Sequence, residues 1–176
     1  MLNPKLETRE VKSTKTMDHL FHDGAIEGVE VRPLKRHKDS RGWLAEIFRA
    51  DEVDLPIMPV MSYVSETLPG TGRGPHEHEA QTDYFCFLGP STFQIIMWDN
   101  RPDSPTYRFR QQLLAGEENP CVVVVPEGVV HAYRNIGQKP GWVINCPNRL
   151  YAGQGRKEPV DEIRHEADPD TPFRIE

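Results

Sequence analysis

Short apolar runs separated by turn residues extend through most of the chain, and they limit the folds that it can adopt. Glycine, proline, asparagine and aspartate cluster between the runs, as they do in turns, and the 16 prolines and 13 glycines leave little room for long helices. The run CVVVV is apolar at every position, which calls for a sheet that is covered on both faces. The pattern therefore predicts an all-β chain of two facing sheets, or a barrel formed from them. The runs that we expect to be strands lie at 29–34, 43–48, 59–65, 83–88, 92–98, 106–114, 121–125 and 142–146.

The two ends of the chain are more polar than its middle. Residues 1–25 lack a clear periodicity, apart from Met17, Leu20 and Phe21, which fit one face of a short helix. After residue 150 the sequence turns polar again, which suggests a loop and a short C-terminal helix. With 176 residues in all, we expect an N-terminal extension over 1–25 and a single domain over 26–176.

Charge and cysteine usage narrow the classes of partner. The net charge of -6 and the lack of a long Lys/Arg run argue against a nucleic-acid partner. No stretch has the apolar length of a membrane span and none resembles a signal peptide, so we expect no membrane partner and a cytoplasmic location. Cys86, Cys121 and Cys146 lie inside apolar runs without CxxC spacing, and we expect them to be buried free thiols.

Two histidine-containing stretches carry a more specific pattern. They read His76-x-His78-x4-Asp83-x5-Gly89 and Pro126-x-Gly128-x2-His131-x3-Asn135. These stretches resemble the two conserved halves of the cupin barrel, with Asp83 where a metal-binding cupin has glutamate. Residues two apart in a strand point to the same face, so His76 and His78 are able to look into a barrel together. One alternative is a site for iron, manganese or zinc, and another is a set of hydrogen-bonded pocket residues. The ligands of such a metal site would be His76, His78, Asp83 and His131.

Five short segments, in order and in register, resemble a narrower family. They are Asp39-x-Arg41-Gly42-x3-Glu46, Arg73-Gly74-x-His76, WDNRPDSPTY at 98–107, PEGVVHAY at 126–133 and DEIRHEADPDTPF at 161–173. Over about residues 26–173 the chain is similar to the dTDP-4-dehydrorhamnose 3,5-epimerase family. The resemblance implies a cupin-type double-stranded β-helix, or jelly-roll, barrel that uses no metal or other cofactor. It also implies a homodimer that acts on a nucleotide-linked keto-sugar and makes precursors for surface polysaccharide or a similar glycoconjugate.

The same resemblance implies catalytic roles. A 3,5-epimerase acts on a 4-keto sugar, whose carbons beside the carbonyl lose a proton to a base and regain one on the opposite face. The family's base falls on His76, and the aspartate that orients its imidazole falls on Asp168. The family's acid is a tyrosine after the last core strand, for which Tyr151 is the nearest match.

Other positions match residues that hold the substrate. Arg41, Arg73 and His131 match contacts to the diphosphate and the sugar, and guanidinium groups suit phosphate oxygens. Glu46 matches a carboxylate that reaches the nucleobase. His78, two residues beyond the base, is expected to contact the substrate in the same pocket.

Departures from the family pattern keep other functions open. The family has a lysine shortly after its base that steadies the enolate oxygen, whereas no lysine occurs here between Lys38 and Lys139. Thr82 or Asp83 stands in the corresponding place. The order Arg-Gly-x-His-x-His over 73–78 instead resembles the sugar-nucleotide 3,4-ketoisomerases. The alternatives to an epimerase are such a ketoisomerase, a metal-dependent cupin enzyme, and a sugar-nucleotide-binding protein without activity.

Overall fold

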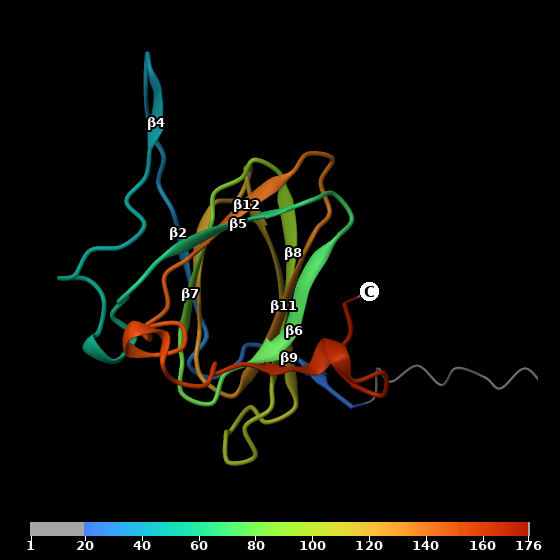
Figure 1. Cartoon of the computed structure of the whole chain (residues 1–176). Coiled ribbons are helices and arrows are strands. Elements are labelled where there is room, and N and C mark those ends of the chain that lie inside the picture. The colour runs from blue at the N-terminus through green and yellow to red at the C-terminus, as the bar shows by residue number, and fades with distance from the viewer. Residues whose placement is uncertain (1–19, 176) are drawn as a thin grey trace, which may run out of the picture.

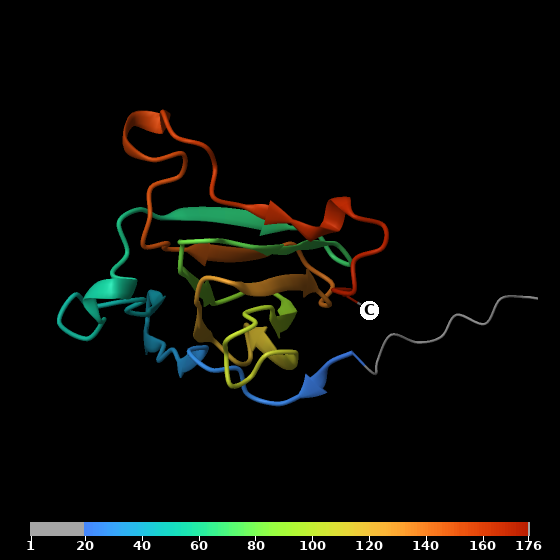
Figure 2. The same ribbon diagram turned by 90° about the horizontal axis from the view of Figure 1, so that it is seen from below.

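The computed structural model of the chain describes residues 20–175, and nearly all of its regular structure is β-strand. Two sheets face each other and wrap around a common interior (Figure 1, Figure 2). β1 and β9 pair in parallel, and the other pairs of the described strands are antiparallel. The six-stranded sheet has the order β1 (His22–Asp23), β9 (Phe109–Gly116), β8 (Thr92–Asp99), β11 (Val129–Asn135), β6 (Gly72–Glu77) and β13 (Ile163–Arg164). The five-stranded sheet has the order β2 (Glu30–Pro33), β10 (Cys121–Val125), β7 (Asp83–Phe87), β12 (Gly141–Asn145) and β5 (Tyr63–Thr67).

A hairpin stands away from these two sheets. It is formed by β3 (His37–Asp39) and β4 (Gly42–Leu44), and Figure 1 shows it projecting beyond the barrel. The Asp39 carboxylate accepts hydrogen bonds from the backbone N–H and the guanidinium of Arg41, at 2.8 and 2.6 Å, which fixes the turn. The residues of both strands are exposed. We call residues 37–44 the hairpin arm.

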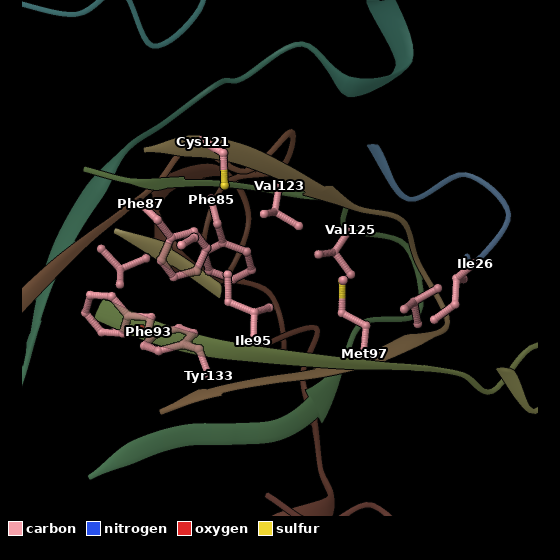
Figure 3. Packing of buried hydrophobic residues seen from close by; sticks show 13 residues of the cluster. Ile26, Phe85, Phe87, Phe93, Ile95, Met97, Cys121, Val123, Val125 and Tyr133 are labelled. Carbon is pink, nitrogen blue, oxygen red and sulfur yellow. The ribbon is translucent and has the colours of Figure 1, made fainter. Parts of the chain in front are cut away.

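The interior of the barrel is filled by side chains from alternate positions of both sheets. Phe85 and Phe87 of β7 point inward, and so do Val123 and Val125 of β10, whereas their neighbours in sequence face outward. Figure 3 shows this packing. The buried cluster consists of Ile26, Phe85, Phe87, Phe93, Ile95, Met97, Ala115, Cys121, Val123, Val125, Val129, Tyr133 and Val143. The same alternation turns the polar residues Asp83 and Asn145 inward, at adjacent ends of β7 and β12.

The all-β prediction is confirmed, but several strands, β6 and β11 among them, lie outside the predicted runs, and others begin or end elsewhere than predicted. β4 ends at Leu44, although the apolar run continues to residue 48. Beyond β4 the chain crosses the outer face of the five-stranded sheet, where Ile47 and Ile57 pack against a second buried cluster that includes Val122 and Val124. Ile47 and Ile57 are therefore partly buried because they pack on the outside of a sheet, although they are not part of a strand.

The helices within residues 20–175 are single turns of 3-10 helix. They are η2 (Leu55–Ile57), η3 (Gln154–Arg156) and η4 (His165–Ala167), and η4 lies where a short C-terminal helix is predicted. Leu20 and Phe21 lie outside any helix, and Phe21 packs against Trp98 and Phe173. Met17 lies outside the described residues, so the N-terminal helix and the boundary of the extension stay predictions.

Two other sequence expectations concern cysteines and membranes. Cys86, Cys121 and Cys146 are buried free thiols, as predicted. Within residues 20–175, no helix has the length and apolar character needed to cross a bilayer.

Candidate active site

A cavity of about 1100 Å³ opens beside the exposed edges of the two sheets. Its walls come from β5, β6, the turn after β6, and the segment 147–166. Four arginines line it together with acidic and aromatic side chains, which suits a substrate that carries both charge and an apolar ring face. The arginines are Arg73, Arg149, Arg156 and Arg164.

The pairing of β6 with β11 directs Arg73 and His76 into this cavity. His76 pairs with His131, and Arg73 pairs with Tyr133, so two residues of β6 lie opposite one residue of β11 between these pairs and the strand bulges. Gly74 permits the bulge, because its φ is +79° and a Cβ there would lie 2.5 Å from the backbone oxygen of His131. The spacing Arg-Gly-x-His is therefore a consequence of close strand contact.

Three imidazoles meet at the floor of the cavity. The ring of His76 lies 4.5 Å from that of His131, centroid to centroid, and 5.7 Å from that of His78. His76 and His78 line the cavity, whereas His131 is 3% exposed and lies behind them. The expectation that His76 and His78 look into the barrel together is confirmed by this geometry.

Asp83 ties the histidines to the barrel. Its Oδ2 accepts a hydrogen bond from Nε2 of His78 at 3.0 Å, and Nε2 of His131 lies 3.1 Å from the same oxygen without hydrogen-bond geometry. Its Oδ1 accepts hydrogen bonds of 2.8 Å from both Gln81 Nε2 and Asn145 Nδ2. The carboxylate is therefore fully engaged, as a buried charge has to be.

These contacts set different protonation states for His76 and His78. Burial, together with the nearby His131 ring, lowers the pKa of His76 to about 3, so this imidazole is neutral at neutral pH. Burial also acts to lower the pKa of His78, but its hydrogen bond and ion pair with Asp83 outweigh burial and raise that pKa to about 9. Burial acts to raise the pKa of Asp83, but His131 and His78 hold it well below its usual range. A neutral imidazole thus stands beside a buried ion pair.

We expect the free energy of unfolding to fall as the pH rises from about 6.5 to about 9. The native state keeps the proton of His78 up to about pH 9, whereas the unfolded chain loses it near pH 6.5, so the native state binds more protons in this window. The loss is about 3 kcal/mol at most, because a factor of ten in an equilibrium constant is worth ~1.4 kcal/mol. Urea unfolding at pH 6.5, 7.5 and 9 in buffers with EDTA measures it. The His78→Gln variant is expected to show a flatter profile, and equal slopes for the two proteins would contradict this assignment.

The same four residues also fit a metal ion. One donor atom from each of His76, His78, Asp83 and His131 lies within 4.8 Å of the others. Nδ1 of His131 donates to the backbone oxygen of Val129 at 3.0 Å, and Nδ1 of His78 contacts the backbone oxygen of Asp161, which leaves both Nε2 atoms facing Asp83. Imidazoles that bind metals are oriented by contacts of this kind. The donor set therefore suits a divalent ion such as iron, manganese or zinc.

The structure does not bring Asp168 to His76. Asp168 is exposed after η4, and its Oδ1 accepts a hydrogen bond from the backbone N–H of Asp170 at 2.9 Å. The carboxylate beside His76 belongs to Glu162, whose Oε1 lies 3.9 Å from Nδ1 of the imidazole. Arg164 contacts Glu162 at 2.7 Å. Glu162 is therefore better placed than Asp168 to orient the imidazole.

The other predicted residues divide between the cavity and the hairpin arm. Arg73 lines the cavity and donates to the backbone oxygen of Glu66 at 3.0 Å, and Tyr151 lies on the cavity lip. Arg41 lies on the arm with its side chain 86% exposed, and Glu46 follows the arm and pairs with Arg49 at 3.5 Å. Neither Arg41 nor Glu46 lines the cavity of its own chain.

Sequence reasoning did not find several residues that build this site. Asp161 holds the C-terminal segment over the cavity, because its carboxylate accepts hydrogen bonds from the backbone N–H groups of Glu79 and Ala80 at 2.8 and 3.0 Å. Asn145 and Tyr63 face the interior from β12 and β5. A polar asparagine within the apolar run WVINC is the signal that points to Asn145, because such a residue is buried only with hydrogen-bond partners.

Comparison with known proteins agrees with this geometry. The sequence model of the dTDP-4-dehydrorhamnose 3,5-epimerase family matches residues 23–158. A probable low-salt glycan biosynthesis epimerase of Haloferax volcanii is 42% identical over 128 residues, which are 72% of this chain and 81% of that protein. A spore coat polysaccharide biosynthesis protein of Bacillus subtilis is 37% identical over 126 residues, which are 72% of this chain and 82% of that protein. The crystal structure of a dTDP sugar isomerase from Desulfovibrio desulfuricans has a TM-score of 0.71 at 22% identity, with 82% of this chain and 87% of that chain covered. This last likeness shows the jelly-roll fold.

Proposed function

Because the chain belongs to the dTDP-4-dehydrorhamnose 3,5-epimerase family, we propose that it inverts one or both carbons beside the carbonyl of a nucleotide-linked 4-keto-6-deoxy sugar. The chain is an isomerase, a nucleotide-sugar epimerase of glycan biosynthesis. The observation that carries the finer proposal is the position of His76 on the wall of a cavity of about 1100 Å³, with Oε1 of Glu162 3.9 Å from its Nδ1. A neutral imidazole is able to accept the acidic proton beside a carbonyl.

The charge that develops on the substrate oxygen needs a positive partner. We assign this role to the His78 imidazolium, whose ring centroid lies 5.7 Å from that of His76 and which keeps its proton through the ion pair with Asp83. Both nitrogens of His78 already have partners, so it acts through its charge and not as a hydrogen-bond donor to the substrate. This arrangement replaces the lysine that the family resemblance leads one to expect.

The second half of the reaction needs an acid on the opposite face of the sugar. Tyr63, Tyr133 and Tyr151 line the cavity, and one of these phenols supplies the proton. The arginines of the cavity bind the diphosphate of the substrate in this proposal. Arg73 is the first choice, because the family pattern assigns it this contact and it lines the cavity.

The substrate site is completed, in this proposal, by a second copy of the chain. Arg41 and Glu46 lie on or next to the hairpin arm and away from their own cavity, so they reach a nucleotide only if the arm enters the cavity of a partner. A partner also has a surface to bind. Trp43, Val64 and Trp142 are 49%, 63% and 53% exposed, and they line a cleft of about 320 Å³ on the outside of the five-stranded sheet.

Light scattering on the purified chain is therefore expected to give a particle of twice the 20.2 kDa chain mass. Val64→Glu is expected to weaken the dimer at least about tenfold, because burial of an unpaired charge costs more than ~1.4 kcal/mol. Leu114→Glu is the matched control, because Leu114 is 53% exposed on the six-stranded sheet. A wild-type particle of 20.2 kDa, or equal effects of the two variants, would speak against this interface.

Product analysis tests the proposed reaction. The chain is incubated with 4-keto-6-deoxy sugars linked to dTDP, UDP, GDP and CDP, and the products are identified by NMR. We expect an epimer at C3, C5 or both with one of these substrates. A product whose keto group has moved to C3 would identify a 3,4-ketoisomerase instead, and binding without turnover would identify a non-catalytic protein.

A metal-dependent cupin enzyme is the second candidate, and the donor set of His76, His78, Asp83 and His131 favours it. A bound ion of this kind supplies Lewis-acid or redox chemistry. Elemental analysis decides between the candidates. Less than one equivalent of iron, manganese or zinc per fully active chain would exclude a metal-dependent enzyme.

A further inference from the structure

The direction of the Tyr63 side chain follows from its place in β5. Ser65 and Thr67 of this strand are partly or fully buried, whereas Val64 and Glu66 between them are exposed. Tyr63 lies two residues before Ser65, so its ring points to the same side of the sheet, the barrel interior. It pairs in register with the buried Asn145 of β12. At the mouth of the barrel this direction places the ring in the cavity wall.

The hydroxyl of Tyr63 is tied to the histidine cluster through one amide group. Nδ2 of Asn145 donates one hydrogen bond to the Tyr63 Oη at 3.0 Å and another to Oδ1 of Asp83 at 2.8 Å. The amide therefore uses both of its protons, and Tyr63 is the acceptor in this contact. Among residues 20–175 no group accepts the proton of the Tyr63 hydroxyl, which leaves that proton for a ligand in the cavity.

Tyr63 and His76 face the cavity from different sheets. Tyr63 belongs to β5 of the five-stranded sheet and His76 to β6 of the six-stranded sheet, and both line the same space. A planar enolate between them would present one face to each side chain. Burial raises the pKa of Tyr63 to about 12, so the phenol carries its proton at neutral pH.

The other two tyrosines of the cavity are less suited to give up a proton. Tyr133 is 5% exposed, and its hydroxyl is engaged with Oγ of Ser65 at 3.0 Å. Tyr151 is 54% exposed, much as Tyr63 is at 48%, and the Arg156 guanidinium lies 5.9 Å from its ring centroid. No described contact connects Tyr151 to the cluster of Asp83 and the histidines.

We propose that Tyr63 is the catalytic acid of this chain and fills the role that the family resemblance implies for Tyr151. The inference rests on the proposed function. The His76 imidazole takes the proton from the carbon beside the carbonyl, the C–H electron pair forms the C=C bond, and the carbonyl oxygen becomes the enolate. Tyr63 then gives its hydroxyl proton to the other face of the same carbon as the carbonyl re-forms. The phenolate regains a proton and the imidazolium loses one to water in the cavity, so substrate and product have the same composition.

Epimerisation in D2O tests this assignment, because it separates removal of the proton from its replacement. In Tyr63→Phe we expect the epimer to form about 10²- to 10⁴-fold more slowly, while His76 still exchanges solvent deuterium into the recovered substrate with retention. Tyr107→Phe is the matched control, since Tyr107 is 38% exposed in a turn away from the cavity, and it is expected to behave as wild type. NMR of recovered substrate and product gives both rates, and near-ultraviolet circular dichroism verifies the fold of each variant.

Each other outcome overturns the inference in a recognisable way. An unchanged rate of inversion in Tyr63→Phe excludes Tyr63 as the acid, and so does loss of exchange together with inversion in a folded variant. Exchange without inversion in Tyr151→Phe assigns the acid to Tyr151. A wild-type chain without exchange or inversion on any nucleotide-linked keto-sugar overturns the proposed function itself.

Discussion

His76→Asn is expected to lose both epimerisation and deuterium exchange, by about 10³-fold or more. His76 is the imidazole on the cavity wall to which we assign removal of the first proton, so the variant lacks the proposed base. Asparagine keeps a polar side chain of similar reach, so the variant retains hydrogen-bonding capacity but not basicity. Initial rates of exchange and of product formation by NMR measure the two losses together.

The matched control for this change is His22→Asn. His22 lies exposed on β1, on the edge of the six-stranded sheet that lies farthest from β6 in the strand order, so both rates are expected to stay at the wild-type level. Exchange in His76→Asn within tenfold of wild type would show that another residue is the base. Equal binding of the nucleotide diphosphate to wild type and to His76→Asn verifies that the loss is chemical.

Asp83→Ala is expected to lower the free energy of unfolding by about 3–5 kcal/mol at pH 7. The carboxylate is 1% exposed and carries the contacts to His78, His131, Gln81 and Asn145, so its removal breaks the ion pair on which the proton of His78 depends and leaves two amide protons without an acceptor. Urea unfolding of the variant and of wild type, at one pH and with EDTA present, gives the difference. An effect below about 1 kcal/mol would contradict the ion pair.

A double-mutant cycle separates the ion pair from the loss of packing. His78→Gln in the Asp83→Ala background has no ion pair left to break, so its cost is expected to be smaller there than in wild type by about 1–3 kcal/mol. Asp103→Ala is the surface control, because Asp103 is exposed in the turn after β8, and a change within about 0.5 kcal/mol is expected.

The sequence predicts the fold class well, because a strand that is buried on both faces is apolar at every position. The run 121–125 is apolar throughout and becomes β10, which is buried at each position. β6 and β11 are different, because their inward side chains include Arg73, His76 and His131, and such polar strands carry a weaker hydrophobic signal. The run 43–48 misleads for the opposite reason, since its apolar residues cover a sheet from outside.

The site is only partly visible from the sequence. His76, His78, Asp83 and His131 are predicted to share one pocket and do meet. Strand parity predicts that His76 and His78 point the same way, and the resemblance to the cupin half-motifs adds Asp83 and His131. The contacts of Glu162, Asp161 and Tyr63 depend on how the C-terminal segment and β5 cross the barrel mouth, which no local pattern records. Asp168 shows the same limit, because a positional match in a polar tail does not determine where the tail lies.

Proton exchange at carbon is the measurement that tests the central claim most directly. The wild-type chain is incubated in D2O with a dTDP-4-keto-6-deoxy sugar, and the proton signals at C3 and C5 are followed by NMR. The assignment of His76 as a base predicts loss of at least one of these signals, together with an inverted centre in the product. Full retention of both protons, with this sugar and with its UDP, GDP and CDP counterparts, would contradict it.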